Sequence, residues 1–310
     1  CTLAATGSGA AATATPSALL DACNTNSFQT VLHAVPTSAQ ASPPAPQAVW
    51  LSQQLLQWPG ATTQGRFALH HSKTGQLQAA PGAPVTGSDG APLALTLHTK
   101  PLPANMAQRF AYVKPGTVLA VHTADLRRLH TLRQGQLLLV QEDANGHVLQ
   151  ATPLHQAGAL DDAYAAAARI PDLGTSLGAR HTQLKVWAPT AQQVHVCLFD
   201  SADGGTIAAA PALQRDAATG AWRYRHGSNL SGRYYSYLVD VFVPGVGLVR
   251  NRVTDPYAVS LNADSQRSYI ADLSDARLKP AGWDNHAAPQ RVKAPVDMSI
   301  YELHVRDFSV

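Results

Sequence analysis

From residue 48 onward, short apolar runs alternate with breaks that are rich in glycine and proline. Within many of these runs, apolar and polar residues alternate with a period of two, which is typical of half-buried β-strands rather than of helices. The runs in the first part of the chain are residues 49–51, 55–58, 67–70, 93–97 and 118–121. We therefore predict a β-rich domain that begins near residue 47.

Residues 137–154 predict two further strands joined by a tight turn. The turn would lie at Asn145 and Gly146, because these residue types accept the positive φ angles of a type I′ connection. Two helices are also predicted, over residues 124–132 and 160–169. The first β domain would thus contain at least seven strands and two helices in one compact segment.

A second series of alternating runs begins at Leu184. Its members are residues 184–188, 194–199, 222–224 and 234–241. Glycine and proline again separate the runs. Several strands within about a hundred residues predict an immunoglobulin-like sandwich.

The flanks of the two β domains have a different composition. The N-terminal segment has little hydrophobic periodicity and many Ala, Thr, Ser and Pro residues, so we predict a flexible arm in which Phe28, Val31 and Leu32 indicate one short strand. The proline-containing segment 255–295 predicts an extended connector. The fold class is mainly β, with two β-sandwich-like domains, of which the second is immunoglobulin-like. The predicted organisation is an arm at 1–46, a first β domain at 47–171, a sandwich with its connector at 172–295, and a final buried strand within 296–310.

Composition narrows the set of partners. Hydrophobic residues make up 45% of the chain, which is a globular value, whereas charged residues make up only 14%. The net charge of +3 comes from scattered residues without a Lys or Arg run. Neither nucleic acid nor an anionic membrane surface is therefore an expected partner. No run approaches the roughly 18 apolar residues of a membrane span.

Three cysteines, Cys1, Cys23 and Cys197, do not make a disulfide framework. Cys197 lies in a strand pattern, where a buried free thiol is the expected state. A cysteine at position 1 followed by small residues resembles a mature bacterial lipoprotein. Cys1 would then be a lipidation site, and the protein would be secreted or held at the cell envelope. An arbitrary cut in a longer chain explains Cys1 equally well.

Four segments resemble pullulanase-type debranching enzymes of the α-amylase family, in the order that those enzymes have them. They are similar to the opening of the N-terminal domain, the first strand of the carbohydrate-binding sandwich, the stretch that joins this sandwich to the catalytic barrel, and the first barrel strand. In this chain they are residues 48–59, 184–191 with Val194, 254–262 with 272–273 and 282–283, and 300–309. Each segment alone is weak evidence for the resemblance. The four in order, which cover roughly residues 48–310, are strong evidence for it.

The resemblance implies a parent enzyme that hydrolyses α-1,6 branch linkages of pullulan, limit dextrin or glycogen by a retaining mechanism. That chemistry needs a nucleophilic carboxylate and a carboxylic acid about 5 Å apart. The chain has only two glutamates, Glu142 and Glu302, and neither matches the family's acid/base position. We therefore assign no catalytic residue and expect this chain by itself to be inactive. Its expected tasks are to support its own catalytic barrel and to bind branched α-glucan. No cofactor is indicated, and the sequence does not show whether the full enzyme needs calcium.

Aromatic side chains of the second β domain are the candidates for sugar contact, because the C–H faces of pyranose rings pack on aromatic rings. We select Trp222, Tyr224 and Trp187. Trp222 follows a glycine near a turn and is expected to be exposed. For Trp187, packing in a core or between domains is the stronger alternative. For Tyr235 and Tyr237, which share one sheet face, buried packing is expected.

The final strand carries three polar residues, His304, Arg306 and Asp307. In a complete barrel, residues near the C-terminal end of a strand approach the active site. A structural ion pair is an equal alternative for these three residues. The thirteen histidines show no spacing typical of metal ligands, so no metal site is predicted.

Two other classes of protein remain open. The first is a free-standing α-glucan-binding module, although a barrel strand without neighbours would leave its backbone donors and acceptors unpaired. The second is a structural pair of sandwiches in which the aromatic residues only form cores. Passage through gels of pullulan, glycogen or β-cyclodextrin without retardation would favour the second class, or a spacer function.

Overall fold

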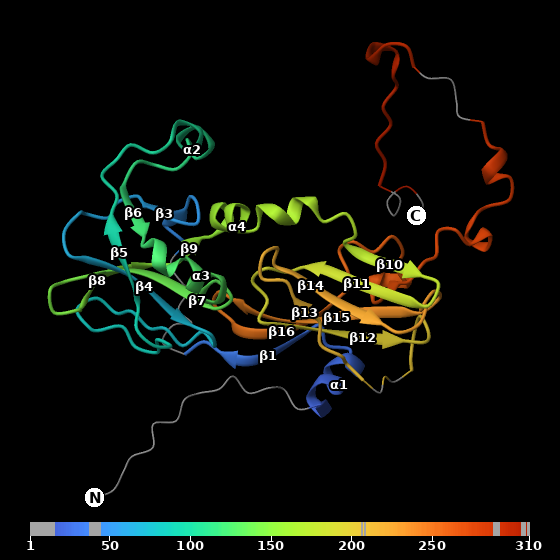
Figure 1. Cartoon of the computed structure of the whole chain (residues 1–310), viewed down its shortest axis with the longest axis horizontal. Coiled ribbons are helices and arrows are strands. Elements are labelled where there is room, and N and C mark those ends of the chain that lie inside the picture. The colour runs from blue at the N-terminus through green and yellow to red at the C-terminus, as the bar shows by residue number, and fades with distance from the viewer. Residues whose placement is uncertain are drawn as a thin grey trace, which may run out of the picture. The chain divides into compact units, whose positions relative to one another are not determined.

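The computed structural model describes residues 16–36, 45–205, 207, 209–287, 292–304 and 308 (Figure 1). The chain divides into two compact units, the first ending at Ala271 and the second beginning at Asp272. Both β domains belong to the first unit. The second unit is short and is described by itself.

The strands of the first β domain form one eight-stranded sheet in the order β8-β7-β4-β5-β6-β3-β2-β9. Neighbouring strands pair antiparallel except β2 and β9, which run parallel. The runs predicted between residues 49 and 121 and the predicted 137–154 hairpin all lie in this sheet. Its strands are β2 (Ala48–Trp50), β3 (Leu55–Trp58), β4 (Arg66–Ser72), β5 (Leu93–Leu97), β6 (Thr117–Val121), β7 (Gln136–Glu142), β8 (Val148–Thr152) and β9 (Leu154–His155).

One apolar core holds this domain together. It takes its largest side chains from strands that are distant in sequence, among them Trp50, Trp58, Leu69, Leu119 and Leu139. In β6, buried and half-buried positions alternate along the strand, as the period-two pattern predicts. Burial of these apolar surfaces is the main force that holds the sheet together.

Short helices accompany the sheet: α2 (Ala104–Arg109), the 3-10 turn η2 (Thr123–Asp125), α3 (Leu126–Leu132), α4 (Ala157–Ala163) and the 3-10 turn η3 (Ala165–Arg169). η2 and α3 match the helix predicted over 124–132. α4 begins earlier than predicted, and α2 has no counterpart in the prediction. Gly158 permits the close approach of α4 to β2, because a Cβ at this position would lie 2.5 Å from the Trp50 carbonyl oxygen.

The connection between β7 and β8 is not the predicted type I′ turn. Gly146 has a φ of +82°, but Asn145 is not among the described residues with positive φ. Instead, the Asp143 carboxylate accepts hydrogen bonds from the backbone N–H groups of Asn145 and His147. An aspartate side chain that bonds to the backbone two residues on closes the loop in place of a second left-handed residue.

The second β domain is a sandwich of two antiparallel sheets. One sheet has the order β1-β16-β15-β12, with β17 also paired to β15, and the other has the order β10-β11-β14-β13. Leu184 and Trp222 from one sheet share a core with Val196 and Tyr235 from the other. The predicted immunoglobulin-like sandwich is confirmed. Its strands are β10 (Gly174–Gly178), β11 (His181–Trp187), β12 (Gln193–Phe199), β13 (Gln214–Arg215), β14 (Ala221–His226), β15 (Tyr234–Val243), β16 (Gly247–Val253) and β17 (Ser268–Tyr269), together with β1 (Gln29–Ala34).

Part of the segment predicted as a flexible arm is folded. Residues Pro16–Asn24 form helix α1, and Gln29–Ala34 form β1, which pairs antiparallel with β16. The Gln29 amide donates a hydrogen bond to the Asn251 side chain across this pair, at 3.0 Å. The predicted short strand is confirmed. The arm prediction is wrong for residues 16–34, because partners more than 170 positions away in sequence order a segment that its own composition would not order.

The prediction of a free thiol at Cys197 is also wrong. Cys197 forms a disulfide with Cys23 of α1, and both residues are buried. Leu19, Phe199 and Leu238 complete a small apolar cluster around the bond. The bond thus fastens α1 to β12 of the sandwich.

The described residues of the second unit form three 3-10 turns, η5 (Ala276–Leu278), η6 (Trp283–Asn285) and η7 (Pro295–Asp297). A further turn, η4 (Ala263–Ser265), precedes it in the first unit. Among the described residues from 292 to 304, none lies in a strand, and Ile300 is 90% exposed. The expected buried strand is therefore not formed there. A strand exists only through hydrogen bonds to a neighbouring strand, and none of the described strands pairs with this segment.

Candidate functional site

A cavity of about 440 Å³ lies within the first unit, between the first β domain and the sandwich. We call it the interdomain cavity. The first β domain contributes residues of β7, β8 and β9 and the segments beside them, and the sandwich contributes Thr190 and the β15–β16 turn. Its volume is in the range of small-ligand sites, which is about 300–1,000 Å³.

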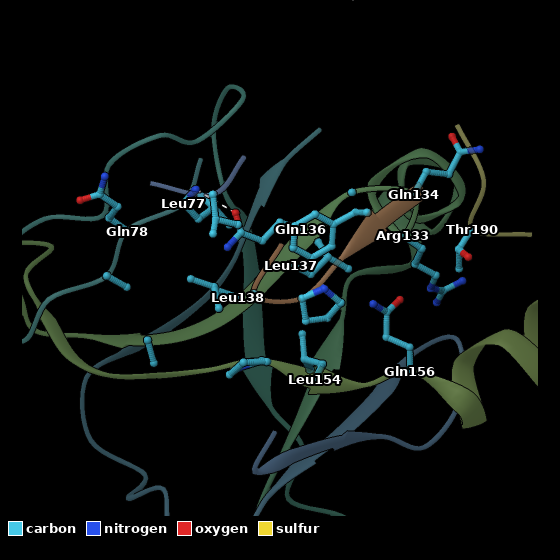
Figure 2. Close-up of a pocket in the computed structure, with 18 of the residues that line it drawn as sticks. Leu77, Gln78, Arg133, Gln134, Gln136, Leu137, Leu138, Leu154, Gln156 and Thr190 are labelled. Atoms are coloured by element: carbon cyan, nitrogen blue, oxygen red, sulfur yellow. Dashed lines mark hydrogen bonds between the residues drawn. The ribbon is translucent and has the colours of Figure 1, made fainter. Parts of the chain in front are cut away.

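The walls of the cavity are mainly apolar. Leu77, Leu137 and Leu154 come from the first β domain (Figure 2). Val241 and Phe242 come from β15. Aliphatic and aromatic walls of this kind can contact the C–H groups of a ligand. Among the described residues, the lining contains no aspartate or glutamate, and its one charged residue is Arg133.

Arg133 is placed by the end of α3. Its backbone N–H donates to the Leu129 carbonyl, so Arg133 is the C-terminal cap of α3. The guanidinium carbon then lies 4.5 Å from the centre of the Trp50 ring, a cation–π contact. Only 2% of Arg133 is exposed. The side chain is therefore held in one orientation by a ring that belongs to the core.

Two polar groups of the lining have no hydrogen-bond partner in the described part of the chain. They are the Nε and Nη2 atoms of Arg133 and the Oε1 atom of Gln156, which lies just before α4. Figure 2 draws both side chains among those that line the cavity. Most buried polar groups of native proteins are paired. These atoms have almost no accessible surface, so they are unpaired groups beside the cavity and are not presented to a ligand within it.

The electrostatics of the cavity follow from burial. Removal from water lowers the pKa of Arg133 to about 10, while the nearby Tyr164 and Asp162 act in the opposite direction. The guanidinium is thus still protonated at neutral pH, so the cavity carries one positive charge.

Glutamine side chains join the two β domains beside the cavity. The Gln134 amide donates to the Ala191 carbonyl, and the Gln192 amide donates to the carbonyls of Lys73 and Gln134, at 2.7 and 3.0 Å. Arg215 of β13 also donates to the hydroxyl of Tyr164, at 2.9 Å. These bonds hold the two sides of the cavity in one arrangement.

Trp222, selected from the sequence as an exposed sugar contact, is buried. It is 6% exposed, packs in the sandwich core, and donates its indole N–H to the Ala188 carbonyl at 2.9 Å. The expectation of exposure is wrong because Trp222, opposite Val186, points to the core face of β14.

The other two aromatic candidates do not form a common platform with Trp222. Tyr224 is half-buried and packs against the same core, two positions along β14. Trp187 neighbours the inward-facing Val186 on β11, so it points to the opposite face of that sheet. Its indole N–H donates to the Thr219 carbonyl at 2.8 Å. The expected burial of Tyr235 and Tyr237 is confirmed, since both are 0% exposed.

The remaining candidates lie elsewhere. His304 is exposed in the second unit, and Arg306, Asp307 and Cys1 lie outside the described residues. Glu142 accepts a hydrogen bond from His70 at 3.0 Å and is partly buried, so it is not the solvated charge that its sequence position suggests. Among the described residues, no group of His, Cys, Asp or Glu could hold a metal ion. Within the same part of the chain, no helix has the length and apolar character needed to cross a bilayer.

The residues of the interdomain cavity carry no signal in the sequence. Arg133 follows an amphipathic helix, where an arginine is ordinarily a solvated residue near the C-terminal end. Gln156 lies in a run without a motif. Only the packing of the two β domains brings these side chains to one cavity.

Comparison with known proteins agrees with this architecture. Residues 45–162 match the family model of the pullulanase N2 domain, and residues 172–258 match that of carbohydrate-binding module 48, the isoamylase N-terminal domain. The chain is 35% identical to a pullulanase of Klebsiella pneumoniae over 269 residues, which is 85% of this chain and 24% of the relative. It is 32% identical to the chloroplastic pullulanase 1 of Arabidopsis thaliana over 85% of this chain and 26% of the relative.

Solved structures show the same relationship. The apo pullulanase of Klebsiella pneumoniae superposes with a TM-score of 0.70 at 32% identity, over 83% of this chain and 27% of that one. A structure of Klebsiella pneumoniae pullulanase complexed with maltotriose gives a TM-score of 0.69 at 33% identity, over 79% of this chain and 23% of that one. This chain spans about a quarter of the length of the curated relatives named above.

Fold and comparisons together define a two-domain β protein whose second domain is a carbohydrate-binding module of the CBM48 type. The order of its two domains and the extent of the match assign the chain to the N-terminal region of the pullulanases.

Proposed function

We propose that this chain is the N-terminal portion of a debranching enzyme that hydrolyses α-1,6-glucosidic linkages of pullulan, limit dextrin or glycogen. Within that enzyme it supports the catalytic domain and binds α-glucan. The observation that carries the proposal is the match of 85% of the chain to a pullulanase. Within this chain, the pullulanase N2 domain and the carbohydrate-binding module follow each other in that order. The carbohydrate-binding module supports the glucan-binding part.

The chain alone is expected to have no hydrolytic activity, because retaining glycosidases need two carboxyl groups about 5 Å apart. Glu142, one of the two glutamates, is bound to His70 within the first β domain, and Glu302 is exposed in the second unit. Neither residue is presented to a cavity as part of a carboxyl pair.

The test compares the protein isolated from its natural source with the 310-residue chain. We expect the natural protein to release reducing ends from pullulan, and the chain to release none. The chain should nevertheless be retarded in gels that contain pullulan or glycogen, relative to gels that contain cellulose. A natural protein inactive on pullulan, limit dextrin and glycogen would contradict the debranching activity, whereas equal migration in all gels would contradict glucan binding.

We further propose that the protein acts outside the cytosol, secreted or at the cell envelope. The Cys23–Cys197 disulfide supports this proposal, because disulfides persist in oxidising compartments and are rare in the cytosol. Fractionation of the source cells, with alkylation of free thiols before and after reduction, tests it. Recovery of the reduced protein from the cytosol would overturn it. Lipidation at Cys1 remains a prediction, which the mass of the N-terminal peptide of the natural protein would decide.

A further inference from the structure

A serine, a histidine and a glutamate form a hydrogen-bonded chain in the first β domain. The Ser88 hydroxyl oxygen lies 2.9 Å from Nδ1 of His70, and Nε2 of the same ring lies 3.0 Å from Oε1 of Glu142. A hydroxyl, an imidazole and a carboxylate in this order are the parts of a triad that activates a serine. None of the three residues lines the interdomain cavity.

Glu142 determines where the proton of the imidazole lies. A carboxylate only accepts hydrogen bonds, so Nε2 of His70 carries the proton that it donates to Glu142. In the neutral ring Nδ1 is then the acceptor, and the Ser88 hydroxyl donates to it. In the triad of the serine proteases Nε2 faces the serine instead. The exchange leaves the chemistry intact, because either nitrogen of a neutral imidazole can be the acceptor.

Two paired strands hold the base and the carboxylate. His70 lies on β4, Glu142 ends β7, and these strands are neighbours in the sheet. Leu69 belongs to the core of the domain, so His70 points from the opposite face of the sheet. Only 6% of His70 is exposed. The packing around the ring therefore keeps it in one orientation.

The connection between β4 and β5 brings Ser88 to this face of the sheet. Thr86 exchanges two backbone hydrogen bonds with Gln78, both at 3.0 Å, and the Asp89 N–H donates to the His71 carbonyl at 2.8 Å. These bonds fix the chain on both sides of Ser88. The serine is thus held against the imidazole by its own backbone.

Ser88 is accessible, in contrast to the ring behind it. The residue is half-buried, and Gly87 and Asp89 on either side of it are exposed. In the described part of the chain, the N–H groups of Ser88 and Gly90 donate to no backbone carbonyl. Such groups are available to the oxygen that becomes negative when a carbonyl is attacked.

We propose that Ser88 takes an acyl group from activated esters, with His70 as its base and Glu142 as the residue that positions the base. Oγ of Ser88 bonds to the acyl carbon, and its proton passes to Nδ1 of His70. The bond between this carbon and the leaving oxygen then breaks, and the leaving oxygen takes the proton from His70. Because Ser88 lies in a surface loop, a small acyl group such as acetyl is the expected substrate.

The test is the reaction of the 310-residue chain with p-nitrophenyl acetate, followed by release of p-nitrophenol and by mass spectrometry of the peptides. We expect acetyl on Ser88, and a release at least about tenfold slower in Ser88→Ala, as loss of a base-assisted nucleophile requires. Phenylmethanesulfonyl fluoride should modify the same residue. Thr86→Val is the matched control, since Thr86 is exposed in the same loop, and it should leave the rate unchanged.

Variants of Glu142 test whether this residue positions the base. Glu142→Gln has the same shape but no charge, and its amide can also donate to Nε2, so the proton is no longer fixed there. We expect it to slow the acetylation about tenfold or more, whereas Glu142→Asp should restore part of the rate. Each variant is first compared with the wild type by circular dichroism and urea unfolding. If Glu142→Gln fails to fold, the acetylated residue of the wild type and the rate of Ser88→Ala decide the matter.

Three outcomes would overturn the proposal. One is a wild-type chain without acetyl on Ser88, and another is an equal rate in Ser88→Ala. The third is an equal rate in a folded Glu142→Gln, which would show that the carboxylate only stabilises the fold. Acylation of Ser88 does not depend on glucan binding or on debranching activity, so the tests of those functions are separate.

Discussion

The Sγ atoms of Cys23 and Cys197 are bonded to each other across a sequence separation of 174 residues. The bond connects α1, which precedes the first β domain, to β12, which follows it. A crosslink over so long a loop restricts the unfolded chain strongly. Both sulfur-bearing residues are also buried, at 2% and 0% exposure, so the folded state protects the bond from reductants.

Removal of this crosslink should lower stability. We expect Cys23→Ser to reduce the free energy of unfolding by about 2–4 kcal/mol, chiefly because the unfolded chain regains conformational freedom. Urea denaturation with and without a phosphine reductant measures the effect. Cys1→Ser is the matched control and should leave the stability of the oxidised protein unchanged, since the other two cysteines pair with each other. A Cys23→Ser protein as stable as the wild type would contradict this account.

The buried ion pair between Asp240 and Arg250 predicts a second effect. The two side chains are 7% and 4% exposed and lie opposite each other on β15 and β16. Asp240→Asn should cost about 3–5 kcal/mol of unfolding free energy, because it leaves a buried guanidinium without its counterion. Denaturant titration tests this value. The exposed pair of Arg128 and Asp125 provides the control, and Arg128→Met should have no measurable effect. Equal effects at the two sites would show that burial does not decide the strength of these pairs.

Trp222 offers a test of core packing against sugar contact. Trp222→Ala should destabilise the sandwich by about 3–5 kcal/mol, because it leaves a large cavity beside Leu184 and Tyr235. Thermal unfolding followed by circular dichroism measures this loss. Trp283→Ala, at a site that is 63% exposed, should not change the unfolding of the β domains. A stable Trp222→Ala protein that is no longer retarded in glucan gels would contradict the core-packing account and indicate that Trp222 contacts sugar.

Stability should also fall in mild acid. Burial lowers the pKa of both His71 and His195 below the ordinary value of 6.5. For His195 the nearby Asp240 acts against this effect and Arg250 adds to it. The unfolded chain therefore binds more protons than the folded one between the ordinary pKa and the lowered pKa. The free energy of unfolding is then highest above about pH 6.5 and decreases as the pH drops through that window.

Urea titrations at about pH 7.5 and about pH 5 measure this loss. Replacement of both histidines by Gln should make the difference between the two pH values smaller than in the wild type. Replacement of the exposed His286 by Gln is the control and should leave the difference as it was. The explanation fails if the doubly substituted protein keeps the full pH dependence.

The strands were predictable because their signal is local. Alternation in segments such as 194–199 follows directly from the two faces of a half-buried strand. The arm was misjudged because the order of α1 and β1 comes from Leu238 and β16, which no local pattern reveals. The pairing of Cys23 with Cys197 could not be predicted either, because it also depends on a distant contact. A residue that is fixed by distant contacts can be identified only from the fold.

The candidate site was less predictable than the fold. An aromatic residue in a predicted carbohydrate-binding domain is a natural candidate for sugar contact. Successive side chains of a β-strand point to opposite faces, however, and Trp222 points into the core. The groups left unpaired at the interdomain cavity are an arginine and a glutamine, residue types that are common on every surface. Their distinction is the burial of Arg133 and the absence of a described hydrogen-bond partner, both of which are properties of tertiary packing.

The pairing of β1 with β16 has a consequence for synthesis of the protein. Gln29 and Asn251 are 222 positions apart, so β1 leaves the ribosome long before its partner β16 has been translated. At roughly 5–20 residues per second, the nascent β1 waits on the order of ten to forty seconds with its backbone groups open. Until β16 is made, the open edge of β1 is a place where another chain could pair.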